Sequence, residues 1–264
     1  MKVHMFWEGS PLSLYENACI RSVVRCGAEV NLYTFTKNLK VPAGVRRRDA
    51  REIATQEESR LFTQDGQKAS ITAFSNLFRY RLLAEEGGWW LDADVFCLRE
   101  AEAFESVALQ SRGLVAAYSI PGEANTAVLH ISDRSIARAL ATRAWEVSER
   151  HRFDFPWGTQ GPHLLTALVA ENPGPCTILP KDVFYPIQWD RTSLFFCPED
   201  RELCLDLTRN SLAVHLFNEV LKRSNVPKDV LPNQGSYLFD LFVSVEPVSW
   251  VQRLRDRLRR QRRA

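Results

Sequence analysis

One stretch, residues 70–98, constrains the fold more than any other part of the chain. Its first part, residues 70–86, places apolar side chains at the spacing of a single helix face, which predicts a helix. Gly87 and Gly88 predict the end of that helix, because glycine takes positive φ without steric cost. The apolar run that follows predicts a buried strand, interrupted by two aspartates. The helix-face residues are Phe74, Leu77, Phe78 and Leu82.

The two interrupting aspartates, Asp92 and Asp94, are two positions apart. Side chains at this spacing point the same way only on an extended backbone. Two carboxylates at the end of an apolar strand are costly to bury unless a cation neutralises them. Hard divalent cations that keep some of their waters and bind phosphate prefer oxygen ligands of this kind. The alternative is a solvated turn, which is the ordinary place for an isolated Asp-x-Asp.

The same stretch resembles a known family. Residues 74–83 read Phe-Ser-Asn-Leu-Phe-Arg-Tyr-Arg-Leu-Leu, and residues 87–95 read Gly-Gly-Trp-Trp-Leu-Asp-Ala-Asp-Val. This resembles the sugar-binding region of the Och1-like and capsular-polysaccharide glycosyltransferases (glycosyltransferase family 32), and distantly the catalytic core of the clostridial glucosylating toxins. The resemblance implies an α/β protein of GT-A fold, with a Rossmann-like, mostly parallel central sheet flanked by helices. It also implies a nucleotide-sugar donor, a Mn²⁺ or Mg²⁺ ion and retention of configuration at the transferred sugar.

The resemblance implies roles for three residues of this stretch. Asp94 would bind the metal directly, while Asp92 would assist it and reach hydroxyl groups of the donor. Arg79 would lie against the donor, where a guanidinium can pair with phosphate or sugar oxygens. From the residues alone, a surface ion pair between Arg79 and Glu86 is an equal alternative for that arginine.

Ser75 and Asn76 lie one helical turn before Arg79, and the resemblance implies that both bind the donor. The family commonly has aspartate where this chain has Asn76. Asparagine still donates and accepts hydrogen bonds, but it removes a charge from the sugar pocket. This departure leaves the identity of the donor sugar open.

The N-terminal part predicts a strand over residues 2–7, a helix over 13–26 and a strand over 28–35. Such a βαβ unit places ligands beyond the carboxyl ends of its strands. The resemblance implies that the aromatic residues at those ends hold the nucleoside, whereas the residues alone favour core packing. The residues concerned are Phe6, Trp7 and Tyr33.

Later segments add further candidates through the same resemblance. Asn125 would contact the donor sugar or the acceptor, or simply begin a turn. Thr159 and Gln160 could reach the acceptor. A lone His215 in an apolar strand is commonly a hydrogen-bonded core residue. The segment nevertheless looks like the late His-x-x-Asn of the family, which makes His215, and with it Asn218, a further metal ligand.

Other elements are predicted from periodicity. Residues 37–68 are polar and indicate a loop followed by a surface helix over 49–62, with the basic run 46–48 either solvated or close to phosphate. Helices are expected over 135–151 and 164–171, a short helix or turn over 99–110, and a mixed apolar segment over 236–245. Strands are expected over 114–119, 125–130, 177–179, 183–186 and around 213–216.

The C-terminal part differs from the rest in charge. A catalytic domain over residues 1–225 and an extension over 226–264 are expected. Residues 251–264 hold seven arginines and one aspartate, a charge of +6, which leaves −4 for the remainder of a chain whose net charge is +2. Such a tail suits an in-plane anchor on anionic lipid, or a solubilising tail without structure. No motif supports nucleic-acid binding.

The six cysteines form no Cys-x-x-Cys pair, which favours a reducing cytosol over a zinc site or a disulfide framework. The N-terminus lacks the pattern of a signal peptide, and no apolar run is long enough to span a bilayer. A cytoplasmic protein is therefore expected, with the basic tail offering peripheral attachment to the inner face of the membrane.

The expected function is that of a metal-dependent retaining glycosyltransferase. It would move a hexose from a UDP-sugar, or from GDP-mannose, to a glycan, a lipid-linked acceptor or another hydroxyl group. Two alternatives remain at this point. One is a nucleotide-sugar hydrolase that uses the same acid pair. The other is a degenerate, non-catalytic homologue that binds nucleotide or membrane.

Overall fold

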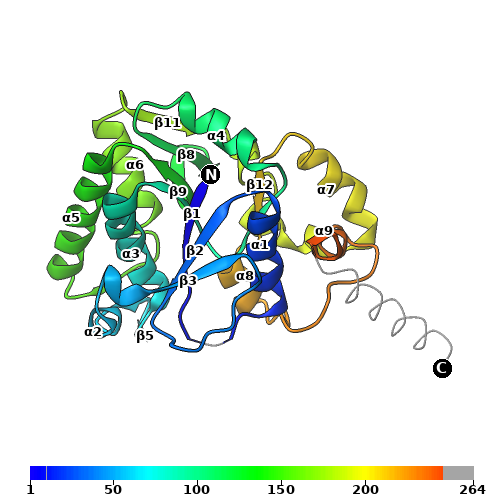
Figure 1. Ribbon diagram of the computed structural model, residues 1–264, viewed down its shortest axis with the longest axis horizontal. Helices are drawn as coiled ribbons and strands as arrows, with labels where there is room; N and C mark the ends of the chain where they lie inside the picture. The colour runs from blue at the N-terminus through cyan, green and yellow to red at the C-terminus, as the bar shows by residue number, and fades with distance from the viewer. Residues whose placement is uncertain (10, 246–264) are drawn as a thin grey trace.

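The computed structural model describes residues 1–9 and 11–245. Its centre is a seven-stranded sheet in the order β11-β8-β9-β6-β1-β2-β3 (Figure 1). Only β9 runs against its neighbours β8 and β6, and every other pair is parallel. The predicted mostly parallel sheet is therefore confirmed. The strands are β1 Lys2–Phe6, β2 Glu29–Thr34, β3 Val45–Asp49, β6 Gly88–Leu91, β8 Leu114–Ile120, β9 Glu123–Ile131 and β11 Cys176–Leu179.

Helices cover both faces of this sheet. On one face, α3, α5 and α6 pack against a core that includes Phe6, Trp90 and Leu129. On the other face, α1 and α4 pack against Met5 and Trp89. Figure 1 shows the two helical layers on either side of the strands. The helices are α1 Leu14–Arg25, α2 Gln56–Ser59, α3 Ile71–Glu86, α4 Ala101–Leu109, α5 Arg134–Arg150 and α6 Pro162–Glu171.

The central stretch folds as its sequence predicts. Ser70 caps α3 by accepting a hydrogen bond from the backbone N–H of Ala73. The helix ends at Gly87, where φ is 64°, and Gly88 has a φ of 82°. A side chain at Gly88 would also meet the Lys2 carbonyl oxygen at 3.2 Å, so glycine is required there for space as well as for conformation.

A short antiparallel pair joins two distant parts of the chain. Strand β7 (Val95–Cys97) continues from the aspartate turn and pairs with β12 (Ala213–His215). The register places His215 opposite Val95, directly beside the acid pair. A second small sheet has the order β10-β4-β5 and is formed by Asp154–Phe155, Thr63–Gln64 and Gln67–Lys68.

The last described elements pack against the first helix. The rings of Tyr15 in α1 and Phe242 in α9 (Tyr237–Val245) lie 4.9 Å apart. Two further helices, α7 (Arg201–Leu207) and α8 (Asn218–Arg223), complete this side of the molecule. The basic tail, residues 251–264, lies outside the described residues. Among the helices of residues 1–9 and 11–245, none combines the length and the apolar character needed to cross a bilayer.

Two predicted elements are wrong. Residues 49–62 do not form one helix, because Arg46, Arg47 and Arg48 extend as edge strand β3 and a 3-10 turn, Ala50–Glu52, follows. Thr55 then starts the four-residue helix α2 with a capping box. The basic run is a solvated strand whose outer arginines pair with acidic neighbours. Residues 183–186 are not a strand, since a 3-10 turn occupies Lys181–Val183.

The buried His4 of β1 makes the stability of the fold depend on pH. Burial and the neighbouring Lys2 lower the pKa of His4 from 6.5 to about 4. In the unfolded chain His4 is therefore protonated below about pH 6.5, whereas in the folded chain it is protonated only below about pH 4. The free energy of unfolding should fall by about 2 kcal/mol through this group between pH 7.5 and pH 5.

Urea unfolding at both pH values measures this loss. The variant His4→Asn should lose about 2 kcal/mol less than the wild type over the same interval. His163→Asn, at an exposed position, serves as the control and should keep the wild-type pH dependence. Identical pH slopes in the wild type and His4→Asn would contradict the assignment.

Candidate metal centre

Three side chains from separate segments meet where β6 ends. Asp92 follows β6, Asp94 lies in the turn before β7, and His215 ends β12. The turn is closed by a hydrogen bond of 3.1 Å from the Val95 N–H to the Asp92 carbonyl oxygen. One potential ligand atom from each of the three side chains lies within 4.8 Å of the other two. The structure thus brings together the three residues that the sequence singles out as first choices for a metal site.

Asp94 is held on both carboxylate oxygens. Its Oδ2 accepts a hydrogen bond of 2.7 Å from the Asn218 backbone N–H, and its Oδ1 lies 3.2 Å from His215 Nε2. Burial acts to raise the pKa of this carboxyl, but His215 and the Asn218 N–H outweigh that effect and lower the pKa. Asp94 therefore carries a negative charge in a buried position.

The His215 ring is fixed between two aromatic rings. Its centroid is 4.1 Å from that of Phe217 and 5.9 Å from that of Tyr185. Burial acts to lower the pKa of His215, but the adjacent Asp94 carboxylate overcomes this and raises it. The other ring nitrogen, Nδ1, is buried and has no hydrogen-bond partner among the described residues. This unpartnered nitrogen is a donor or acceptor that the protein itself leaves unused.

Asp92 is bound to the buried Arg79 of α3. Arg79 Nη2 donates to Asp92 Oδ1 at 2.6 Å, and Trp90 Nε1 donates to the same oxygen at 2.6 Å. Arg79 Nη1 also donates to Asn76 Oδ1 at 2.6 Å and to the Thr126 hydroxyl. The Arg79 side chain is 3% exposed and the Asp92 side chain 28%. Arg79 therefore holds Asp92 from the buried side, while the Asp92 side chain is partly exposed to solvent.

The charges around Asp92 oppose one another. Burial raises the pKa of this carboxyl, Arg79 lowers it and the neighbouring Asp94 raises it again. The expected alternative, an ion pair between Arg79 and Glu86, does not form, because Glu86 pairs with Lys2. With Asp92 and Asp94 ionised, Arg79 charged and His215 neutral, the cluster has a net charge of −1, which favours a cation beside the two carboxylates.

The remaining predicted donor residues lie in different surroundings. Phe6 is buried among the rings of Phe35, Phe74 and Phe78, and Tyr33 is fully buried. These positions fit the core packing that the sequence left open. A direct contact of either side chain with a nucleoside stays a prediction.

Trp7 is half-buried and lines a pocket of about 500 Å³ beside α1 and α8. The Lys228 ammonium lies 5.8 Å from the centre of its ring. The other residues that line this pocket are Pro11, Leu12, Ser13, Glu16, Lys222, Asn225, Val226 and Asp229. Trp7, one of the predicted nucleoside residues, therefore adjoins a pocket.

Three polar residues predicted to bind donor or acceptor form side-chain hydrogen bonds within the protein. Ser75 Oγ donates to the Thr72 carbonyl oxygen, and Asn125 Oδ1 accepts from the Ala127 N–H at 2.8 Å. Gln160 is buried, and its amide donates to the Ala144 carbonyl oxygen in α5. The expectation that Gln160 reaches an acceptor is therefore wrong, because helix packing holds its side chain inside the molecule.

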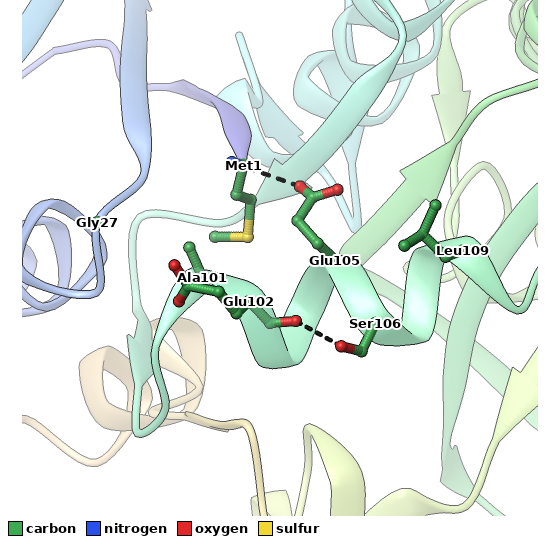
Figure 2. A pocket seen from close by; sticks show the side chains of 7 residues that line it. All are labelled: Met1, Gly27, Ala101, Glu102, Glu105, Ser106 and Leu109. Carbon is green, nitrogen blue, oxygen red and sulfur yellow. Dashed lines mark hydrogen bonds and ion pairs between the residues drawn. The ribbon is translucent and has the colours of Figure 1, made fainter.

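A second pocket, of about 330 Å³, lies away from the acid pair. It is formed by Met1 at the start of β1 together with α4, whereas the carboxylates follow the carboxyl end of β6. Figure 2 shows the Met1 amino group directed at Glu105 across this pocket. Its lining contains no part of the candidate site.

Sequence reasoning missed three residues of the site: Trp90, Thr126 and Glu16. Trp90 precedes Asp92 by two positions, so an extended backbone could have indicated that both side chains share a face. Thr126 lies in β9 and meets Arg79 only because α3 packs against this face of the sheet. Glu16 lies in α1 and contacts Asn218 only in the folded protein. No local pattern marks the last two.

The cluster fits a divalent cation by its chemistry. Two carboxylates and one imidazole are a donor set that suits Mn²⁺ and Mg²⁺. A cation would account for two neighbouring carboxylates with His215 Nε2 only 3.2 Å from Asp94 Oδ1. Asn218 contacts the cluster through its backbone N–H, which donates to Asp94 Oδ2, while its side-chain nitrogen donates to Glu16 Oε1 at 2.7 Å.

Family models match two parts of the chain, and both contain site residues. Residues 61–115, which hold Asp92 and Asp94, match the model for capsular polysaccharide synthesis proteins. Residues 154–234, which hold His215, match the model for the conserved region of alpha 1,4-glycosyltransferases. A lactosylceramide 4-alpha-galactosyltransferase from Rattus norvegicus is 27% identical over 161 residues, which cover 56% of this chain and 41% of the rat protein.

Solved glycosyltransferase structures share the fold. The apo form of GlyE from Streptococcus pneumoniae aligns with a TM-score of 0.57 at 16% identity, over 98% of this chain and 63% of that one. The galactosyltransferase LgtC, solved with donor and acceptor sugar analogs, aligns with a TM-score of 0.53 at 14% identity, over 95% and 99% of the two chains. The chain is therefore a protein of the GT-A fold, related in sequence to the alpha 1,4-glycosyltransferases and the capsular polysaccharide synthesis proteins.

Proposed function

We propose that this protein is a metal-dependent glycosyltransferase that takes a hexose from a nucleotide-sugar. The observation that carries the proposal is the convergence of Asp92, Asp94 and His215 at the end of β6 in a GT-A fold. Ligands of open α/β sheets bind beyond the carboxyl ends of the parallel strands, which is where this cluster lies.

The donor is proposed to be a UDP-sugar, with GDP-mannose as the second candidate. The rat relative is named for the transfer of galactose in α-linkage, and common nucleotide hexoses are themselves α-linked. An α-linked product from such a donor requires retention of configuration. Because the chain spans 41% of the length of that relative, its acceptor is not carried over. The acceptor class proposed is a glycan, a lipid-linked sugar or another hydroxyl group.

Asp94, Asp92 and His215 would hold the ion, which we propose to be Mn²⁺ or Mg²⁺, and Asn218 supports it through Asp94. When bound, such an ion neutralises the pyrophosphate that leaves the sugar. Arg79 orients Asp92 through the bond of its Nη2 and acts to lower the pKa of this carboxyl against the effect of burial. The Asn218 N–H does the same for Asp94.

Both carboxylates are assigned to the ion, and neither to nucleophilic attack on the sugar. Asp92 accepts hydrogen bonds from Arg79 and Trp90, and Asp94 accepts one from Asn218 beside His215. We therefore propose a front-face transfer, in which the leaving phosphate oxygen takes the proton of the acceptor hydroxyl. Trapping of a glycosyl group on either aspartate would contradict this mechanism.

The test is a thermal-shift panel of UDP-sugars and GDP-mannose, each with and without Mn²⁺. A ligand at 100 times its Kd stabilises the folded state by about 2.7 kcal/mol, which corresponds to a rise in Tm of about 5–10 °C for a chain of this size. The panel should yield one nucleotide-sugar whose shift depends on Mn²⁺. A panel without any shift would refute the proposal.

Product analysis with that donor separates the three functions considered. Nucleotide release that requires a sugar acceptor identifies a transferase. Equal release with and without an acceptor identifies a hydrolase, and binding without release identifies a non-catalytic homologue. Peripheral attachment to anionic membranes through residues 251–264 remains a proposal from sequence, since the tail lies outside the described residues.

The Thr126 hydroxyl should matter for activity through Arg79. Thr126→Val keeps the shape of the side chain but removes one hydrogen-bond partner of the buried guanidinium. We expect the free energy of unfolding to fall by about 1–2 kcal/mol and kcat/KM for the donor to fall about tenfold, the equivalent of 1.4 kcal/mol.

Urea unfolding and initial rates measure the two quantities. Thr166→Val is the matched control, because the Thr166 hydroxyl accepts a hydrogen bond from the Ala124 N–H of the same strand, β9. It should cost similar stability and leave kcat/KM unchanged. Equal activity losses in both variants would show that Thr126 acts only through the fold.

A further inference from the structure

Glu16 is a buried carboxylate that the proposed reaction does not use. It occupies the first turn of α1, and its side chain has no exposed surface. Its Oε2 accepts a hydrogen bond of 2.8 Å from the Ser13 N–H in a capping box. A capping box alone does not require burial, since Glu58 makes the same bond at Thr55 in α2 with part of its side chain exposed. Something besides helix capping therefore holds Glu16 inside.

The other oxygen of Glu16 binds two residues from the far end of the chain. Oε1 accepts a hydrogen bond of 2.7 Å from Asn218 Nδ2 and an ion pair from the Lys228 ammonium. One carboxylate thus ties the start of α1 to the start of α8 and to the loop that follows α8. Burying it without Lys228 would cost several kcal/mol, so the three contacts form a unit.

Asn218 connects the Glu16 carboxylate to the metal cluster. Its backbone N–H donates to Asp94 Oδ2 at 2.7 Å, while its side-chain nitrogen is bound to Glu16. The preceding residue, Phe217, has a φ of 55°, a left-handed conformation that a phenylalanine adopts only when surrounding contacts enforce it. The Glu16–Asn218 bond is one contact that holds the chain in this conformation, and the N–H is thereby aimed at Asp94.

We infer that Glu16 is a positioning residue of the metal centre, which acts on Asp94 through Asn218. This inference rests on the proposed function, because it needs a cation at Asp92, Asp94 and His215. Partners that orient the direct ligands of a metal commonly change its affinity by 10–100-fold when removed. Glu16 is therefore expected to set the affinity for Mn²⁺ without touching the ion.

The experiment measures Mn²⁺ binding directly, by electron paramagnetic resonance of the free ion and by the Mn²⁺-induced rise in Tm. Glu16→Ala should raise the Kd for Mn²⁺ at least tenfold. Glu16→Gln keeps one oxygen for Asn218 Nδ2 but loses the second oxygen and the charge that pairs with Lys228, so its Kd should lie between those of Glu16→Ala and the wild type. Glu58→Gln is the matched control, a capping-box glutamate bound to Arg81 away from the site, and should leave the Kd unchanged.

The outcomes separate this inference from the proposed function. A wild type that binds no Mn²⁺ refutes the metal centre itself. A folded Glu16→Ala with the wild-type Kd refutes the role of Glu16 alone. If Glu16→Ala does not fold, the comparison moves to Asn218→Ser, which breaks the same bond from the other side. Normal Mn²⁺ affinity in Asn218→Ser would then overturn the inference.

Discussion

Replacing Asp94 with asparagine is expected to reduce the rate of glycosyl transfer by at least about 10³-fold. The substitution keeps the size of the side chain and an oxygen for the Asn218 N–H, but it removes the charge that would bind a cation. The Mn²⁺-induced rise in Tm should disappear together with the activity. Initial rates with the best donor of the thermal-shift panel, and melting curves with and without Mn²⁺, measure both effects.

Asp133→Asn is the control for this experiment. Asp133 caps α5 by accepting a hydrogen bond from the Ser135 N–H, and asparagine caps helices about as well. This variant should keep the wild-type rate and the response to Mn²⁺. Undiminished turnover in Asp94→Asn would remove Asp94 from the catalytic machinery and with it the proposed metal centre.

Replacing Arg79 with leucine is expected to have the largest effect on stability. The guanidinium is buried and binds Asp92, Asn76 and Thr126 at once. Removal of one partner from a buried ion pair costs about 3–5 kcal/mol; because the Asp92 side chain is 28% exposed, we expect about 3 kcal/mol. Transfer activity should also be lost, since Asp92 would lose the hydrogen bond that orients it and the positive charge that acts to lower its pKa.

Arg81→Leu provides the comparison two residues further along the same helix. Arg81 pairs with Glu58 at 2.9 Å, and both side chains of that pair are partly exposed. Its loss should cost no more than about 1 kcal/mol and leave the rate unchanged. Urea unfolding of the three proteins tests the difference. Equal losses of unfolding free energy for Arg79→Leu and Arg81→Leu would show that burial of the Arg79–Asp92 pair does not add to its contribution to stability.

The local elements of the centre could be predicted from sequence. The apolar face of α3, the glycines after it and the acid pair after β6 are each set by neighbours within a few positions. The resemblance carried by the same residues implied the GT-A fold, which the comparisons confirm. The predictions at residues 49–62 and 183–186 were wrong because polar residues in the first segment and a proline in the second have similar local preferences for helix, strand and turn.

The partners of these residues could not be predicted locally. Periodicity allowed Arg79 to pair with Glu86, but the sheet buries Arg79 against Asp92 and leaves Glu86 to Lys2. Phe6 and Tyr33 end neighbouring strands as expected, yet their rings turn into the core. Whether an aromatic ring at a strand end faces a ligand or the core depends on which helix covers that face.

The sequence by itself determined the chemistry available at this site, namely two carboxylates on one strand end and an imidazole in a late apolar strand. Only the tertiary structure decided that they meet, through the pairing of β7 with β12 and a bond between Asn218 and Asp94 across 124 positions. The physical reason is that periodicity and turn preference act over a few residues. Contacts between distant segments depend instead on how whole strands and helices bury their apolar faces.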